Sequence, residues 1–244
     1  MVEIKNQLIL KTNKVGVFIK REDLIHPFVS GNKYRKLKYN LLKAKEDGYS
    51  VLLTFGGAFS NHIAAVAFAG KENNFKTIGI IRGDELREKV EDNPTLKFAQ
   101  ENGMQFDFIS RAQYSDKQSP EFEEELRRRF GNFYLIPEGG TNELAVKGCE
   151  EILTADDAQF DYICCAVGTG GTISGIINSV LPHQKVLGFP ALKGDFLKKE
   201  IRKFASNENW ELIADYHFGG YGKVNLELIE FINNFYQDNN VPLD

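Results

Sequence analysis

Cysteine is scarce in this chain of 244 residues, which contains only Cys149, Cys164 and Cys165. An odd number with two adjacent members is not typical of a disulfide framework, and no pair has the C-x-x-C spacing of a zinc site. The four histidines are also scattered without metal-ligand spacing. We therefore expect buried free thiols and no metal site.

A basic excess and long apolar runs are absent as well. The net charge is −4 at pH 7, whereas a nucleic-acid-binding protein usually concentrates positive charge. No apolar run approaches the roughly 18–20 residues that span a bilayer. Residues 1–5 lack the apolar stretch of a secretory signal. We expect a cytoplasmic protein that binds neither nucleic acid nor a membrane.

What the chain does have is a regular alternation of short apolar runs with helical patterns. Strands are expected at residues 51–55, 76–81, 105–109, 132–136, 161–167 and 185–189. Helices are expected at residues 61–72, 94–101, 121–129, 144–153, about 173–180, 195–205 and 225–237. This alternation predicts an α/β fold with parallel strands and right-handed crossovers. The strand at 161–167 is apolar after Asp161, which predicts burial on both sides.

A lysine motif, VSGNKYRKL, occupies residues 29–37. Its Gly-Asn pair suits a turn that enters a helix, and Asn32 could cap that helix. Lys33 and Lys36 would share one helical face because they are three residues apart. The motif is either a solvated basic helix start or a reactive amine with a phosphate-binding partner.

Two glycine-bearing loops each follow an expected strand. The first loop is TFGGAFSNH, residues 54–62. Its polar triplet at residues 60–62, Ser-Asn-His, either caps a helix or binds a carboxylate beside the helix amides. In AVGTGGT, residues 166–172, glycines would let the backbone approach a phosphate at a helix N-terminus. The second loop lacks the lysine of a nucleotide-triphosphate loop, so a phosphate monoester is favoured over a nucleotide triphosphate. Phosphate binding is favoured over a purely structural turn because of the helix amides.

The order of these motifs resembles that of a known family. KREDL at residues 20–24, SGNKYRKL, GGAFSNH and GTGGT follow one another as in the 1-aminocyclopropane-1-carboxylate deaminase and D-cysteine desulfhydrase family. This family is a branch of the fold type II pyridoxal-phosphate (PLP) enzymes, and the resemblance covers nearly the whole chain. It implies a PLP cofactor, a small amino-acid substrate, a homodimer and two three-layer α/β domains of the tryptophan synthase β-like kind.

The resemblance also implies which residues hold the cofactor. Lys33 matches the lysine that holds PLP covalently and serves as catalytic base, Lys36 a lysine at the cofactor phosphate, and Asn61 an asparagine at the ring hydroxyl. The residues that match the phosphate cup are Gly168, Thr169, Gly170, Gly171 and Thr172.

Substrate contacts are implied in the same way. Ser60 matches a serine that holds the substrate carboxylate, with Asn61 beside it. His62 occupies a position where desulfhydrase-like members carry histidine and deaminases carry glutamine. Tyr221, in a Gly-Gly-Tyr-Gly run, matches a catalytic tyrosine, although an aromatic anchor for a glycine turn is the alternative.

Two reactions fit the resemblance, and both yield a 2-oxo acid and ammonia: ring opening of 1-aminocyclopropane-1-carboxylate and β-elimination of sulfide from D-cysteine. A cysteine-synthase-like β-replacement enzyme and a PLP-binding pseudoenzyme are the alternatives. By the same resemblance, residues 1–44 and 138–244 form the larger, cofactor-binding domain and residues 45–137 the smaller one. Because the family continues past the final Pro-Leu-Asp, we expect an incomplete large domain with weakened PLP binding and impaired catalysis.

Overall fold

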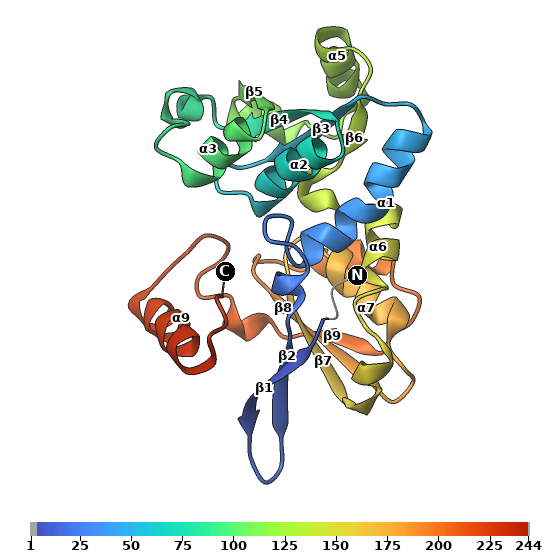
Figure 1. Cartoon of the computed structure of the whole chain (residues 1–244), viewed down its shortest axis with the longest axis vertical. Helices are drawn as coiled ribbons and strands as arrows, with labels where there is room; N and C mark the ends of the chain where they lie inside the picture. The colour runs from blue at the N-terminus through green and yellow to red at the C-terminus, as the bar shows by residue number, and fades with distance from the viewer. Residues whose placement is uncertain (1–3, 244) are drawn as a thin grey trace. The chain divides into compact units, whose positions relative to one another are not determined.

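The computed structural model describes residues 4–243, which fall into two compact units (Figure 1). We call residues 22–152 the contiguous unit, and residues 4–21 with 153–243 the discontinuous unit. The sequence placed residues 22–44 and 138–152 outside the smaller domain. In the structure they cluster with residues 45–137, because α1 (Asn32–Glu46) packs against α2 (Asn61–Glu72) and α6 (Glu143–Cys149) packs along α1.

The contiguous unit is built on a four-stranded parallel sheet with the order β5-β4-β3-β6. Its strands are β3 (Val51–Gly56), β4 (Lys76–Arg82), β5 (Met104–Ile109) and β6 (Tyr134–Ile136). All four were expected from the sequence, and the predicted parallel β3–β4 pairing is confirmed. Their carboxyl ends lie at one edge of the sheet, where ligands usually bind in α/β folds.

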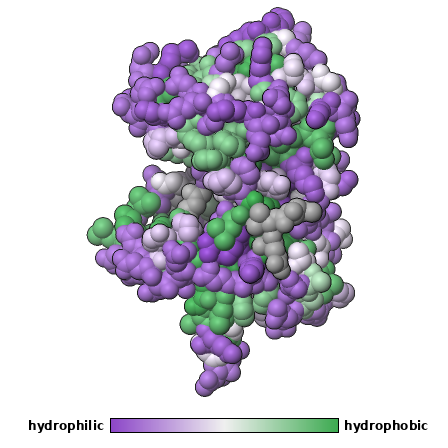
Figure 2. All heavy atoms as spheres, in the orientation of Figure 1, coloured by the Kyte–Doolittle hydropathy of each residue, from purple (hydrophilic) through white to green (hydrophobic). Residues whose placement is uncertain are grey.

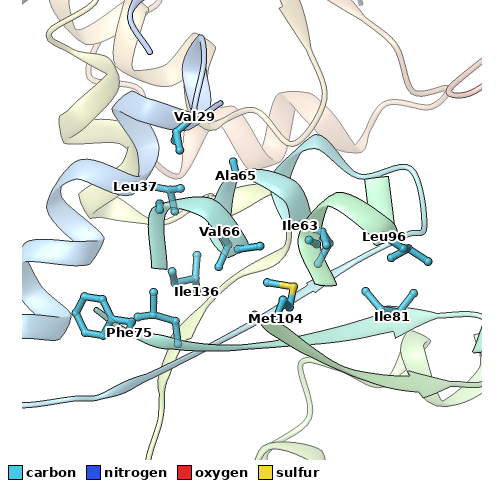
Figure 3. Close-up of a cluster of buried hydrophobic side chains, with 14 of the residues drawn as sticks. Val29, Leu37, Ile63, Ala65, Val66, Phe75, Ile81, Leu96, Met104 and Ile136 are labelled. Atoms are coloured by element: carbon cyan, nitrogen blue, oxygen red, sulfur yellow. The ribbon is translucent and has the colours of Figure 1, made fainter. Parts of the chain in front are cut away.

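Helices cover both faces of this sheet, as expected for a three-layer domain. Side chains of α1, α2 (Asn61–Glu72) and α3 (Pro94–Glu101) form one buried cluster, whose members Ile63, Val66 and Ile81 are shown in Figure 3. Side chains of α4 (Arg111–Ser115) and α5 (Pro120–Phe130) form a second cluster on the other face. Neighbours such as Leu52 and Leu53 join opposite clusters, because successive strand residues point to opposite faces.

The discontinuous unit contains a three-stranded parallel sheet and an N-terminal hairpin. Its strands are β1 (Asn6–Lys11), β2 (Gly16–Lys20), β7 (Tyr162–Val167), β8 (Lys185–Pro190) and β9 (Trp210–Leu212), and its helices are α7 (Gly171–Ser179), α8 (Phe196–Arg202) and α9 (Leu226–Asn239). Shorter 3-10 helices in the two units are Glu22–Leu24, Asp84–Lys89, Glu138–Gly140, Ala155–Gln159 and Ala214–Tyr216. The hairpin and β9 were not predicted from the sequence.

The prediction that β7 is buried on both sides is wrong. Tyr162, Cys164 and Ala166 are exposed, because α7 packs against the opposite face of β7 and no helix among residues 4–243 covers the face that carries these three side chains. The expectation of buried thiols is therefore wrong for Cys164 and confirmed for Cys149. All three cysteines are free thiols.

One buried carboxylate, Asp157, fastens the hairpin to its unit. Asp157 accepts hydrogen bonds from Lys20 Nζ at 2.7 Å, from Asn6 Nδ2 at 2.9 Å and from the Thr154 amide at 2.7 Å. The hairpin itself presents apolar side chains to solvent, and Leu10 is 54% exposed. Hydrophobic surface is visible on this protruding segment in Figure 2. The hydrogen bonds to Asp157 therefore add to the small apolar contact between the hairpin and the rest of the discontinuous unit.

Replacing Asp157 with alanine is expected to lower the free energy of unfolding by about 2–4 kcal/mol, because it leaves the partly buried Lys20 ammonium without its partner. Burial alone would raise the pKa of Asp157, but the bonds from Lys20, Thr154 and Asn6 lower it below its usual value. This stabilisation is present above the unfolded-state pKa and is lost as pH falls through the folded-state pKa. Urea unfolding at several pH values measures both effects. Asp156→Ala, an exposed neighbour, is the control, and equal midpoints for the two variants would contradict the assignment.

Candidate active site

The lysine motif opens α1 in a way that differs from the prediction. The N-cap is Gly31, with φ 57° and no side-chain cap, so the expectation that Asn32 caps this helix is wrong. Backbone with positive φ favours glycine, which explains why the turn needs this residue. The following turn is also not a solvated basic start, because Arg35 and Lys36 are buried, with Lys36 only 2% exposed.

Lys36 reaches the loop that follows β6. Its Nζ donates hydrogen bonds to the carbonyl of Gly139 at 2.9 Å and to Thr141 Oγ1 at 3.0 Å. A buried ammonium is stable only with such partners. Lys33, three residues earlier on the same helix, is half-buried. The structure thus brings two amines to one face of α1.

The loop after β3 carries the predicted Ser-Asn-His triplet into α2. Ser60 is the N-cap and accepts a hydrogen bond from the Ile63 amide at 3.4 Å, which confirms the capping interpretation. Its amide donates to the Gly57 carbonyl at 3.1 Å and closes a tight turn. A hydroxyl that accepts with a lone pair still has its hydrogen to donate. Ser60 can therefore cap the helix and bind an anion at the same time.

His62 is buried and its tautomer follows from its partners. Its Nε2 lies 2.9 Å from Thr54 Oγ1, which donates its own hydrogen to the Ile136 carbonyl at 2.8 Å. Because a hydroxyl has only one hydrogen, Nε2 of His62 must carry the proton in this pair. Nδ1 is then the unprotonated nitrogen, and it has no hydrogen-bond partner among residues 4–243. It faces Gly140, where an added Cβ would lie 3.4 Å from it.

We expect His62 to stay neutral across the physiological range. Burial, then the positive charges of Lys33 and Lys36, lower the pKa of His62 well below its ordinary value, against a small opposite effect of the Pro137 carbonyl. An unfolded histidine gains a proton below about pH 6.5, so the native state loses stability as pH falls through that value, by up to about 1.4 kcal/mol per pH unit.

Nitrogen-15 spectra of the imidazole rings test this directly. The expected result is a neutral Nε2–H tautomer for His62 between about pH 5 and 8, with His62→Gln removing part of the acid destabilisation. A His62 ring that titrates near pH 6.5 would show that the burial and charge argument is mistaken.

The GTGGT loop opens α7 in the discontinuous unit. Gly170 is its N-cap in the left-handed conformation, with φ 88°, and the Ser174 amide donates to the Gly170 carbonyl at 3.0 Å. A Cβ on Gly168 would meet no atom within 4 Å, so open space adjoins the loop. The first amides of a helix have no intrahelical acceptor. With the Thr169 and Thr172 hydroxyls, this donor set fits a phosphate group such as that of PLP.

Tyr221 lies on an exposed loop of the same unit. It is 66% exposed and is flanked by Gly219, Gly220 and Gly222, which all have positive φ. The predicted residues are therefore divided between the units. The contiguous unit holds Lys33, Lys36, Ser60, Asn61 and His62, whereas the discontinuous unit holds Tyr221 and residues 168–172.

Sequence reasoning missed the residues that support these side chains. Thr54 orients His62, and the loop at 138–141 supplies the acceptors for Lys36. A usable signal was present, because Glu-Gly-Gly-Thr follows the predicted strand at 132–136 as the other glycine loops follow theirs. Within residues 4–243, no group of three His, Cys, Asp or Glu side chains could hold a metal, and no helix is long and apolar enough to cross a membrane.

Comparisons with known proteins define the class. Residues 4–191 match the profile of the family described as pyridoxal-phosphate dependent enzymes. The solved structure of a homologue of 1-aminocyclopropane-1-carboxylate (ACC) deaminase superposes with a TM-score of 0.85 at 26% identity, covering 100% of this chain and 80% of that one. The structure of O-ureido-L-serine synthase, a TM-score of 0.70 at 12% identity, shows a shared fold alone.

Two relatives define the branch. A Pyrococcus horikoshii protein, provisionally assigned as an ACC deaminase, is 30% identical over 239 residues, covering 88% of this chain and 71% of that protein. The mitochondrial bifunctional D-cysteine desulfhydrase/ACC deaminase of Arabidopsis thaliana is 30% identical over 260 residues, covering 95% of this chain and 64% of that protein. The chain belongs to the pyridoxal-phosphate dependent enzymes, in the branch that contains these deaminases and desulfhydrases.

Proposed function

We propose that this chain is a PLP-dependent enzyme that releases ammonia and a 2-oxo acid from a small amino acid, either by opening the ring of ACC or by eliminating sulfide from D-cysteine. The observation that carries this proposal is the similarity over 95% of the chain to a relative named for both activities. The geometry supports it, because the two lysines and the serine turn occupy one α/β unit whose loops suit anion binding.

Each predicted residue has a role in the proposal. Lys33 would hold PLP covalently, Lys36 and residues 168–172 would bind its phosphate, and Asn61 would contact its ring hydroxyl. When bound, PLP supplies an electron sink for charge that develops on the substrate. The Lys33 amine would then remove and return a proton as general base.

The substrate would be held mainly by the start of α2. Ser60 can donate its hydroxyl hydrogen to the substrate carboxylate, and the first amides of α2 add a favourable positive dipole end. Asn61 and His62 would border the same group, with Tyr221 near the reacting atoms. His62 is only 2% exposed. Its ring would therefore define the shape of the substrate site from within the protein rather than lie in open solvent.

An absorbance spectrum with added PLP, before and after borohydride reduction, tests the cofactor site. The expected result is a visible band that reduction converts into an adduct on Lys33, identified by peptide mapping. Assays for sulfide, 2-oxo acid and ammonia then distinguish D-cysteine from ACC as substrate. A folded protein that gains no label on Lys33 and releases no ammonia would refute the proposal.

We further propose that the chain forms a homodimer and acts in the cytoplasm. Both statements rest on the family resemblance and on the charge and hydropathy of the sequence. Light scattering coupled to gel filtration tests the first, with a mass near twice 27.6 kDa as the expected result. Fractionation of cells that express the natural gene tests the second.

A further inference from the structure

Arg82 occupies an unusual position at the ligand-binding edge of the contiguous unit. It is the last residue of β4 and is exposed at the carboxyl end of the parallel sheet. Its guanidinium lies 5.6 Å from the centroid of the Tyr114 ring. A Cβ on Gly57 would lie 3.6 Å from Arg82 Nη2, so this guanidinium also approaches the turn that ends in Ser60.

The charge of Arg82 is not neutralised by the acidic groups around it. Glu85 bonds to Arg111 at 2.6 Å, and Asp107 bonds to Arg129 at 2.7 Å. Over the part of the chain that the structure describes, Arg82 makes no ion pair. The Arg82 guanidinium, which has five N–H donors, is therefore available to bind an anion at the carboxyl end of the sheet.

A third acidic group, Glu138, is engaged by other partners. Its Oε1 accepts a hydrogen bond from Tyr114 at 2.8 Å, and its Oε2 lies 3.2 Å from Lys117 Nζ. Because Tyr114 is only 3% exposed and its hydroxyl is bound, its ring is a fixed support for the Arg82 guanidinium. Holding a cation in place before binding lowers the entropic cost of the contact.

We infer that Arg82 is a specificity-determining residue that binds a second acidic group, carried on the side chain of the substrate. This inference rests on the proposed function, in which Ser60 holds the α-carboxylate. Ser60 and Arg82 flank the same turn at residues 57–60. Arginine recognises planar anions with two parallel hydrogen bonds. Arg82 would thereby add a further substrate class to ACC and D-cysteine, which lack a second carboxylate: small amino acids with an acidic side chain.

Binding of aspartate and alanine to the PLP-loaded protein tests this inference, with both enantiomers of each and with the dissociation constant taken from the change in cofactor absorbance. Aspartate carries a second carboxylate, and alanine does not. The wild type is expected to bind aspartate more tightly. Arg82→Met should weaken aspartate binding roughly tenfold or more, and alanine binding by less than about twofold, because charge-assisted hydrogen bonds contribute strongly.

Two variants serve as controls. Arg82→Lys keeps the charge but not the planar fork, so it should restore part of the aspartate preference. Arg128→Met removes an exposed arginine of α5 and should leave both constants unchanged.

Three outcomes would overturn the inference. If Arg82→Met weakens aspartate and alanine binding equally, Arg82 contacts the α-carboxylate or has a structural role. If the wild type binds alanine and aspartate equally well, the inference about Arg82 is wrong, while the proposed function is unaffected. A wild type that binds neither amino acid would remove the inference, whereas the assays for sulfide, 2-oxo acid and ammonia with D-cysteine and ACC decide separately whether the proposed function stands.

Discussion

Lys33→Ala is expected to lower the rate of ammonia release by roughly a thousandfold or more, because it would remove the covalent anchor of the cofactor and the general base together. The position is specific, since Lys33 lies in the first turn of α1, on the face that also carries the buried Lys36. The measurement is the initial rate of 2-oxo acid formation, together with borohydride labelling of the loaded protein.

Lys43→Ala is the matched control for this prediction. Lys43 lies on the same helix, is exposed and pairs with Asp47 at 2.6 Å, so its loss should leave the rate and the label unchanged. Lys33→Arg should be as inactive as the alanine variant, because arginine keeps the charge but is not deprotonated in proteins. Full activity in either Lys33 variant would disprove the assignment.

Gly148→Ala is expected to destabilise the contiguous unit by roughly 3 kcal/mol or more. A Cβ at this position would lie 1.9 Å from the Arg35 carbonyl oxygen and 2.8 Å from its carbon, both backbone atoms of α1. Glycine to alanine inside a helix normally stabilises by about 0.5–1 kcal/mol. The clash reverses that sign, because α6 can accept the methyl group only by moving away from α1.

The urea midpoint and the cofactor affinity of Gly148→Ala should fall together, since α1 carries Lys33 and Lys36. Lys147→Ala is the control, because the neighbouring Lys147 is exposed and its loss removes only a contact with the Tyr39 ring. If Gly148→Ala unfolds at the wild-type midpoint, the two helices do not approach as closely as described.

Features with local causes could be predicted from the sequence. The helices at 61–72 and 94–101 have the bounds that were expected, because Ser60 and the Asn93-Pro94 pair mark their starts with local capping signals. The parallel strands followed from alternation with helices. The cofactor motifs were visible for the same reason, since each lies in a short loop between a strand and a helix.

Features that depend on distant partners could not be predicted. Lys36 is buried and bonded to acceptors more than one hundred residues away, which a reading of its own helix as a solvated basic start does not reveal. The apolar run of β7 is half exposed because its neighbours cover one face only. Nothing in residues 6–20 indicates that Asp157 fastens the hairpin. Composition and periodicity do not report such pairings.

The interrupted path of the chain has a consequence during translation. Residues 22–152 leave the ribosome before residue 153, so the four-stranded sheet can form while its neighbour is still being made. The hairpin emerges before the contiguous unit but must wait for Asp157, its polar partner, which is synthesised well over one hundred residues later. Residues 22–152 form the loop that must close when the hairpin meets Asp157. Once these residues have folded, the loop is effectively shorter, so closing it costs less entropy. Docking of the hairpin onto Asp157 is therefore expected to be a late step in the folding of the discontinuous unit.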